Sequence, residues 1–317
     1  MKNKIWISMI VITMVMTLFG CEKKETETLE NSDEKLSVIT TLFPYYDFVK
    51  QIAGDKVNVS MIVPAGMDTH SFEPTPADMI TIQKADVFIY NGGDMESWVS
   101  QVLDASENKE QVTDVMMDHV KIVVEETVEG MELEEEGEEG EVEYDEHIWT
   151  SPVNAQKIVA EICTVLSKAD PDNANVYQKN TDAYIVQLKD LDKEFKDVIN
   201  NSDRKTIIFG DKFPLRYFAE EYGLTYYAAF PGCSTETEPS PDTVAFLIDK
   251  AKEEKVPVIY YLELSSQKIA DTICEGAGAK KLLFHSCHNV SKDDFNSGVT
   301  YLELMKQNVR NLKEGLN

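Results

Sequence analysis

Short β-branched runs that alternate with helical segments constrain this chain most strongly, because such alternation is typical of parallel βα units. In the first half the expected strands are residues 37–42, 57–63, 85–90 and 120–124. In the second half they are residues 206–209, 225–230, 256–262 and 281–284. The pattern therefore predicts an α/β fold with two similar parallel-sheet lobes.

One long helix is expected between the two halves. An apolar stripe repeats there at spacings of four and three, at Tyr184, Leu188, Leu191, Phe195 and Val198. A helix over residues 173–200 would span roughly 40 Å at about 1.5 Å per residue. We therefore expect an N-terminal lobe over residues 37–172, a linking helix over 173–201 and a C-terminal lobe over 202–317.

The N-terminal residues carry an export signal. Lys2 and Lys4 precede an apolar stretch, residues 5–17, that is short for a membrane span, and Leu18-Phe19-Gly20-Cys21 follows. This resembles a bacterial lipoprotein signal, which implies a signal peptide over residues 1–20 and a lipid (palmitate) anchor on Cys21. Polar residues 21–36 would be a tether. The expected location is the extracytoplasmic face of the cell membrane; a plain secretory signal is the alternative.

The net charge excludes one class of partner. The 317 residues carry a formal charge of −27, and such a chain cannot neutralise phosphates, which argues against nucleic-acid binding.

Cysteine is sparse. Beyond Cys21 there are Cys163, Cys233, Cys274 and Cys287, too few for a disulfide scaffold, although Cys233 and Cys287 lie in predicted loops and could pair.

An acidic segment, residues 125–146, leads to a histidine. It holds thirteen Asp or Glu residues and no Lys or Arg, so we expect a solvated loop that attracts cations without fixing one. His147 follows at the start of an ordered segment that enters a helix. We interpret His147 as a metal ligand; an ordinary surface histidine beside a solubilising insertion is the alternative.

Other polar side chains follow the predicted strands, where ligands bind in open parallel sheets. They are His70 after 57–63, Asp211 after 206–209, Glu263 at the end of 256–262, and His285 and His288 after 281–284. Only His119, among the five histidines, lies away from both these loops and the acidic segment, and it is interpreted as structural. These histidines are too scattered for a zinc finger, but they could converge in a cleft between the lobes. Unrelated histidines remain the alternative.

Motifs along nearly the whole mature chain resemble the substrate-binding lipoproteins of bacterial zinc and manganese ABC importers. They include Thr40-Thr41-Leu42-Phe43-Pro44, Pro64-Ala65-Gly66 with His70, Glu73-Pro74-Thr75-Pro76, residues 145–149 and Glu221-Tyr222-Gly223-Leu224. The resemblance implies a metal held in the cleft between two lobes and delivered to an ABC permease. It also implies that His70 and His147 are ligands.

Two positions depart from the family pattern. Lys212, beside Asp211, stands where a third histidine is usual, and His285 stands where an aspartate is usual. The expected ligands are therefore His70, His147, His285 and Asp211, with water or His288 as competitors for the place of Asp211.

Three imidazoles and one oxygen suit zinc better than manganese, which favours oxygen donors. The expected function is capture of a transported Zn²⁺ ion, not enzymatic catalysis. A zinc-dependent hydrolase and a surface adhesin are the alternatives; the first is disfavoured because the sequence has no His-Glu-x-x-His motif.

Overall fold

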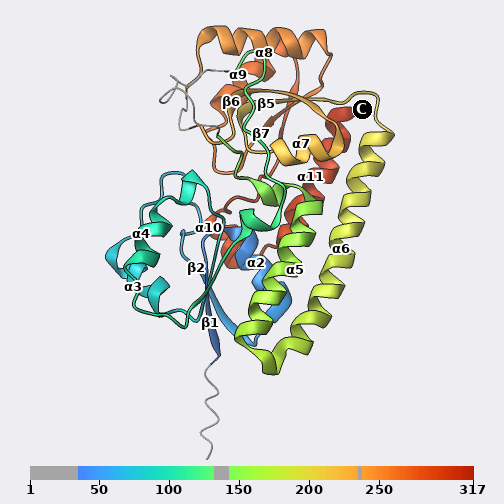
Figure 1. Ribbon diagram of the computed structural model, residues 1–317. Coiled ribbons are helices and arrows are strands. Elements are labelled where there is room, and N and C mark those ends of the chain that lie inside the picture. Colours follow the sequence, from blue (N-terminus) through green and yellow to red (C-terminus); the bar gives the residue numbers. More distant parts are fainter. Residues whose placement is uncertain (1–34, 132–142, 235–237) are drawn as a thin grey trace, which may run out of the picture. The chain divides into compact units, whose positions relative to one another are not determined.

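Two parallel four-stranded sheets form the framework of the molecule (Figure 1). The computed structural model describes residues 35–131, 143–234 and 238–317, and Lys35–Asn317 form one compact unit. The strand orders are β2-β1-β3-β4 in the first sheet and β6-β5-β7-β8 in the second. The predicted fold class, two α/β lobes with a long helix, is confirmed.

The first sheet belongs to the N-terminal lobe. Its strands are β1 (Leu36–Thr40), β2 (Val57–Met61), β3 (Val87–Tyr90) and β4 (Val112–Val115), and its helices are α2 (Phe43–Ala53), α3 (Pro76–Lys84) and α4 (Trp98–Asp104), with short 3₁₀ turns η1 (Asp94–Glu96) and η2 (Met116–His119). Helix α3 begins at Pro76 because Thr75 and Asp78 form a reciprocal capping box there.

One predicted strand of this lobe is wrong. The fourth strand is β4, which pairs in parallel with β3, and not residues 120–124. Val123 instead leaves the sheet and donates its N–H to the Tyr217 hydroxyl of the other lobe at 3.2 Å. The β-branched run resembles a strand because Val120 and Val123 pack against the core from a segment that crosses between the lobes.

Helices connect the two sheets. After η3 (Ile148–Thr150) come α5 (Pro152–Ala169), η4 (Pro171–Asn173) and α6 (Ala174–Asn200). The apolar stripe of α6 buries Tyr184, Leu188, Leu191 and Phe195, and α6 packs against α5, α2 and the C-terminal helix α11 (Figure 1).

The second sheet belongs to the C-terminal lobe. Its strands are β5 (Thr206–Phe213), β6 (Thr225–Pro231), β7 (Val258–Tyr261) and β8 (Lys280–Leu283), and its helices are α7 (Arg216–Tyr222), α8 (Pro241–Glu253), α9 (Lys268–Ala277), α10 (Lys292–Ser297) and α11 (Tyr301–Leu316). Every predicted strand of this half overlaps one of these four strands.

The last helix returns to the first lobe. The N–H of buried Tyr301 donates to the Asp47 carboxylate of α2 at 2.9 Å, and its hydroxyl donates to the Trp149 carbonyl at 2.7 Å. Contacts of the C-terminal helix thus cross the predicted lobe boundaries at residues 172 and 201. The boundaries themselves stay a prediction. The predicted signal peptide and Cys21 lie outside the described residues.

The ends of the acidic segment form a strap, defined here as residues 121–131 and 143–146, between the lobes. Val124 and Tyr144 form an antiparallel bridge, and Glu125 donates its N–H to the Glu143 carbonyl at 3.0 Å. Tyr217 donates its hydroxyl proton to the Asp145 carbonyl at 2.8 Å. The prediction of a solvated loop is wrong for Asp145 and Glu146, which are buried, whereas Glu126, Glu129 and Glu143 are exposed; residues 132–142 lie outside the described part.

The strap also contacts α8. Gly130 has a φ of +86°, and a Cβ there would lie 2.0 Å from the Phe246 ring, so only glycine fits this approach. Met131 is buried beside it. These contacts hold the end of the first strap segment, residues 121–131, on the C-terminal lobe.

The predicted pairing of Cys233 with Cys287 is wrong, because both are free, as are Cys163 and Cys274. Cys287 is buried in the core near Tyr301, whereas Cys233 lies beside Glu125 of the strap.

In the described part of the chain, no helix has the length and apolar character to cross a membrane.

Candidate metal centre

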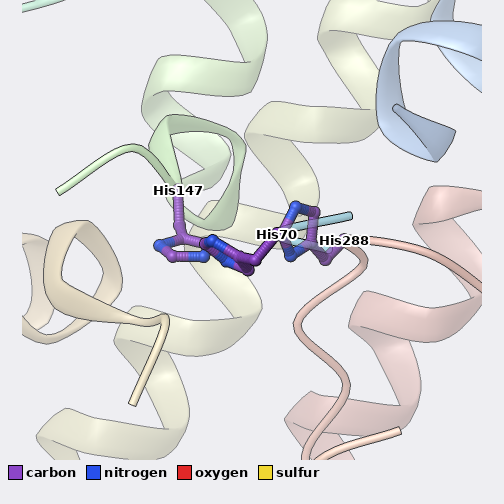
Figure 2. A group of neighbouring side chains, drawn as sticks. All are labelled: His70, His147 and His288. Carbon is purple, nitrogen blue, oxygen red and sulfur yellow. The ribbon is translucent and has the colours of Figure 1, made fainter. Parts of the chain in front are cut away.

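Three histidines from loops far apart in the sequence converge on one point. His70, His147 and His288 each offer a ring nitrogen, and these atoms lie within 4.8 Å of one another. Their ring centroids are 5.1 to 5.5 Å apart. Figure 2 shows the three rings gathered together. His70 follows β2, His147 follows the strap and His288 follows β8.

Hydrogen bonds between the loops keep two of these histidines together. The Asn289 side chain donates to the Pro64 and Met67 carbonyls at 2.9 Å each, and the Gly66 N–H donates to the Val290 carbonyl at 2.8 Å. The loop that carries His70 is therefore joined to the loop that carries His288.

The Asp145 carboxylate orients the His147 ring. This ring is fully buried, and its Nδ1 lies 3.3 Å from the Asp145 Oδ1. The Nε2 atom has no hydrogen-bond partner among the described residues. Because a buried polar atom without a partner costs free energy, this nitrogen is a strong candidate to bind a ligand.

The three imidazoles differ in their affinity for protons. Burial lowers the pKa of His70 to about 4, with a further contribution from neighbouring His147. Burial and His147 also place the pKa of His288 well below its ordinary value. Burial alone would lower the pKa of His147, but the carboxylates of Asp145, Glu125 and Glu146 together outweigh it and raise that pKa. At neutral pH two rings therefore present free lone pairs, and the third holds its proton more tightly than an exposed histidine.

His288 is packed by residues of the N-terminal lobe. Its ring contacts the Thr69 hydroxyl and the Met95 sulfur, the latter at 3.0 Å. The Glu146 carboxylate accepts the Met95 N–H at 3.1 Å, so a residue next to His147 also positions the neighbour of His288. The Trp149 ring centroid lies 5.0 Å from that of His288.

His285 does not join the cluster. Its Nδ1 accepts the Cys287 N–H at 2.9 Å and lies 3.4 Å from Glu263 Oε1. The Asn308 side chain accepts the backbone N–H of His285 and donates to the His285 carbonyl, each at 2.7 Å. The structure therefore gives His285 a structural position and places His288, the predicted competitor, beside His70 and His147. The sequence alone does not show which of His285 and His288 is the ligand, because both follow the same strand in a non-helical loop.

Asp211 is near the histidines but is already engaged. Its carboxylate accepts the Lys212 N–H at 2.9 Å and the Leu262 N–H at 3.1 Å. Burial raises its pKa. Asp211 lines the same cavity as the histidines but does not belong to the group of converging ligand atoms.

A cavity of about 380 Å³ surrounds the cluster. Its lining comes from both lobes and includes all three histidines, Asp68, Asp211, Lys212 and Glu263. The predicted placement of a site at the strand ends between two lobes is thus matched by the cavity.

A second group of possible ligand atoms lies elsewhere, in the N-terminal lobe. His119 Nε2 lies 2.9 Å from the Asp114 carboxylate and its Nδ1 lies 3.7 Å from that of Glu161. Both ring nitrogens thus face carboxylates that they can pair with, which fits the interpretation of His119 as structural.

Comparisons with known proteins agree on one family. The family model described as "Zinc-uptake complex component A periplasmic" matches residues 38–315. The high-affinity zinc uptake system protein ZnuA of Bacillus subtilis (strain 168) is 38% identical over 320 residues, which cover 99% of this chain and 98% of that protein.

Solved structures share the fold. The metal-dependent lipoprotein YcdH from Bacillus subtilis is 36% identical with a TM-score of 0.76, over 89% of this chain and 100% of that one. The Zn(II)-bound ZnuA-like domain of Streptococcus pneumoniae AdcA is 32% identical with a TM-score of 0.74, over 89% of this chain and 99% of that one.

Proposed function

Because the chain belongs to the family of periplasmic components A of zinc-uptake complexes, we propose that it captures a zinc ion outside the cytoplasmic membrane and delivers it to an ABC-type permease. Zinc is the cargo of this protein, bound for transfer. Relatives with zinc-uptake and zinc-bound descriptions support this choice of ion.

The proposed ligands are His70, His147 and His288. The observation that carries the proposal is the buried Nε2 of His147, which has no hydrogen-bond partner among the described residues and lies in a cluster of three converging imidazoles. Zinc accepts nitrogen donors readily and usually takes about four ligands, whereas manganese favours oxygen. The three nitrogens leave room for one further ligand.

We place the protein on the outer face of the membrane, anchored through Cys21. The export signal and the polar tether in the sequence support this location. A binding role is favoured over hydrolysis because the matching family model and the relative from Bacillus subtilis are described by zinc uptake.

Calorimetry and native mass spectrometry of the mature chain test the function. We expect one tightly bound zinc ion per chain and a melting temperature that rises with zinc, because the ion binds the folded state preferentially. Alanine at His70 or His147 should abolish tight binding, while His119→Ala, a histidine outside the cavity, should retain it. A wild-type protein that neither holds zinc nor gains stability from it would refute the proposal.

A further inference from the structure

The cavity around the histidine cluster is larger than a metal ion needs. Its volume is about 380 Å³, whereas one water occupies about 30 Å³ in the liquid. Cavities that hold small organic molecules measure roughly 300–1,000 Å³. The space beside the three imidazoles is therefore sufficient for an ion together with a small molecule.

None of the protein's own carboxylates in this cavity belongs to the group of converging ligand atoms. Each accepts at least one backbone N–H, Asp68 from His70, Asp211 from Lys212 and Leu262, and Glu263 from Ser286. The converging ligand atoms are all nitrogens of neutral donors. A metal bound to them keeps its full double charge and an open coordination position, which an external anionic oxygen can fill.

Lys212 supplies a positive charge on the wall of this cavity. It forms no salt bridge with any carboxylate in the described part of the chain. It lines the same cavity as His70, His147 and His288. A lysine placed there disfavours a bare cation but stabilises an anion bound next to it.

The start of α9 adds donors to the same wall. Gln267 is the N-cap residue, with a left-handed φ of 61°, and no side chain caps this helix. Ser265, Ser266, Gln267 and Ile269 line the cavity. An uncapped helix start exposes backbone N–H groups and a partial positive charge, which attract carboxylates.

We propose that the cavity receives the metal ion as a complex with a small carboxylate-bearing chelator, such as an amino acid. The carboxylate completes the coordination of the metal and lies against Lys212 and the start of α9, while the histidines hold the ion. This inference rests on the proposed function, since it requires a metal at the histidine cluster.

The charges of the cavity make the two components depend on each other. Asp68, Asp211 and Glu263 oppose Lys212 alone among the charged side chains of the lining, so an anion without a metal is repelled. A dication at the histidines reverses this balance. The chelator should therefore bind only after or with the metal, and by linkage it should strengthen metal binding by the same factor.

Cobalt(II) in place of zinc provides a visible spectrum that reports its ligands. Glycine, added to the cobalt-loaded mature chain, should change this spectrum in a saturable way and should not bind the metal-free protein in calorimetry. Lys212→Gln should weaken glycine binding about tenfold, as expected for loss of one charge-assisted contact, and Lys212→Arg should retain most of it. Lys280→Gln, a highly exposed lysine at the opposite end of β8 that pairs with Glu314, is the matched control and should bind like wild type.

A cobalt spectrum that glycine leaves unchanged, or equal glycine affinity in wild type and Lys212→Gln, would overturn this inference while the proposed function stands. Glycine binding without metal would also overturn it. Failure of cobalt and zinc to bind at all would remove the proposed function and the inference together.

Discussion

The indole Nε1 of Trp149 donates to the backbone carbonyl of Ser286 at 2.9 Å. This hydrogen bond ties the turn after His147 to the loop that carries His288. The Trp149 side chain is fully buried, and its ring centroid lies 5.5 Å from that of His147 and 5.0 Å from that of His288. The separation of two proposed ligands is thus fixed through one side chain that binds no metal.

Trp149→Phe should destabilise the protein and weaken zinc binding. The change leaves the buried Ser286 carbonyl without its partner and opens a cavity, at a total cost of about 2–4 kcal/mol. Urea unfolding and zinc calorimetry measure the two effects. Trp98→Phe, a half-buried tryptophan that packs on Phe72 and is not part of the cavity lining, should lower stability less and change zinc affinity less. Wild-type affinity in Trp149→Phe would show that the loops keep their spacing without this bond.

His288→Ala and His285→Ala should have different effects. His288→Ala removes a proposed ligand and should weaken zinc binding by orders of magnitude, with little loss of stability in the metal-free protein. His285→Ala leaves the buried Cys287 N–H without its acceptor, which should lower the free energy of unfolding by about 1–3 kcal/mol. Zinc affinity should change little in His285→Ala. The reverse pattern in calorimetry would return His285 to the ligand set.

Zinc affinity should depend on pH mainly through His147. Its pKa is raised above the ordinary value of 6.5, so in the metal-free protein this proton favours the folded state below about pH 6.5 and that contribution is lost as pH rises through the raised pKa. Zinc must displace the proton, and the logarithm of its affinity should fall by about one per pH unit below that pKa.

His70 contributes to pH dependence in a lower range. Its pKa of about 4 lies below that of the unfolded chain, so it destabilises the folded metal-free protein as pH falls from about 6.5 towards 4. Zinc titrations between pH 5 and 8 check the dependence on His147, and urea unfolding of the metal-free protein at decreasing pH checks the contribution of His70. A slope of two or three per pH unit throughout this range would mean that His70 and His288 also carry protons there.

Asp145→Asn tests the residue that orients His147. The asparagine can still accept the His147 N–H, a bond of 2.8 Å from Asp145 Oδ1, but it loses the charge that raises the pKa of the ring. Loss of such a supporting carboxylate typically costs about 10- to 100-fold in metal affinity. Asp68→Asn, which alters the carboxylate that accepts the His70 N–H on an exposed loop, should cost less. Equal losses in calorimetry would contradict a special role for Asp145.

Tyr217→Phe should loosen the strap. The hydroxyl accepts the Val123 N–H and donates to the Asp145 carbonyl, so its removal leaves two backbone groups without this partner at a cost of about 1–3 kcal/mol. Hydrogen exchange should become faster at residues 121–126 and 143–146. Tyr261→Phe, a tyrosine of β7 in the same lobe whose ring lies beside the Lys281 ammonium, is the control. Unchanged exchange in the strap would mean that its other contacts hold it without the Tyr217 hydroxyl.

Local sequence signals predicted the elements that depend on local contacts. Thr75, Pro76 and Asp78 set the start of α3 within three residues, and the apolar stripe of α6 defines one long helix by itself. The strap could not be predicted in this way. Its acidic residues suggest solvation, and its anchors, Tyr217 and Phe246, lie in the other lobe.

The residues of the candidate site also differ in whether local sequence signals predict them. His70 and His147 are each marked by neighbouring motifs, and both lie in the cluster. The choice between His285 and His288 depends on Asn308 of α11, which holds the backbone of His285 and fixes the course of the loop. A contact between residues that are so far apart in sequence leaves no pattern in the loop itself.

The bridge between Val124 and Tyr144 makes the strap a natural place for protein engineering. Because Glu125 and Glu143 are hydrogen-bonded neighbours, the distance that an inserted sequence must span is short and does not depend on its length. An epitope or a fluorescent domain introduced between them would begin and end at the same point on the surface.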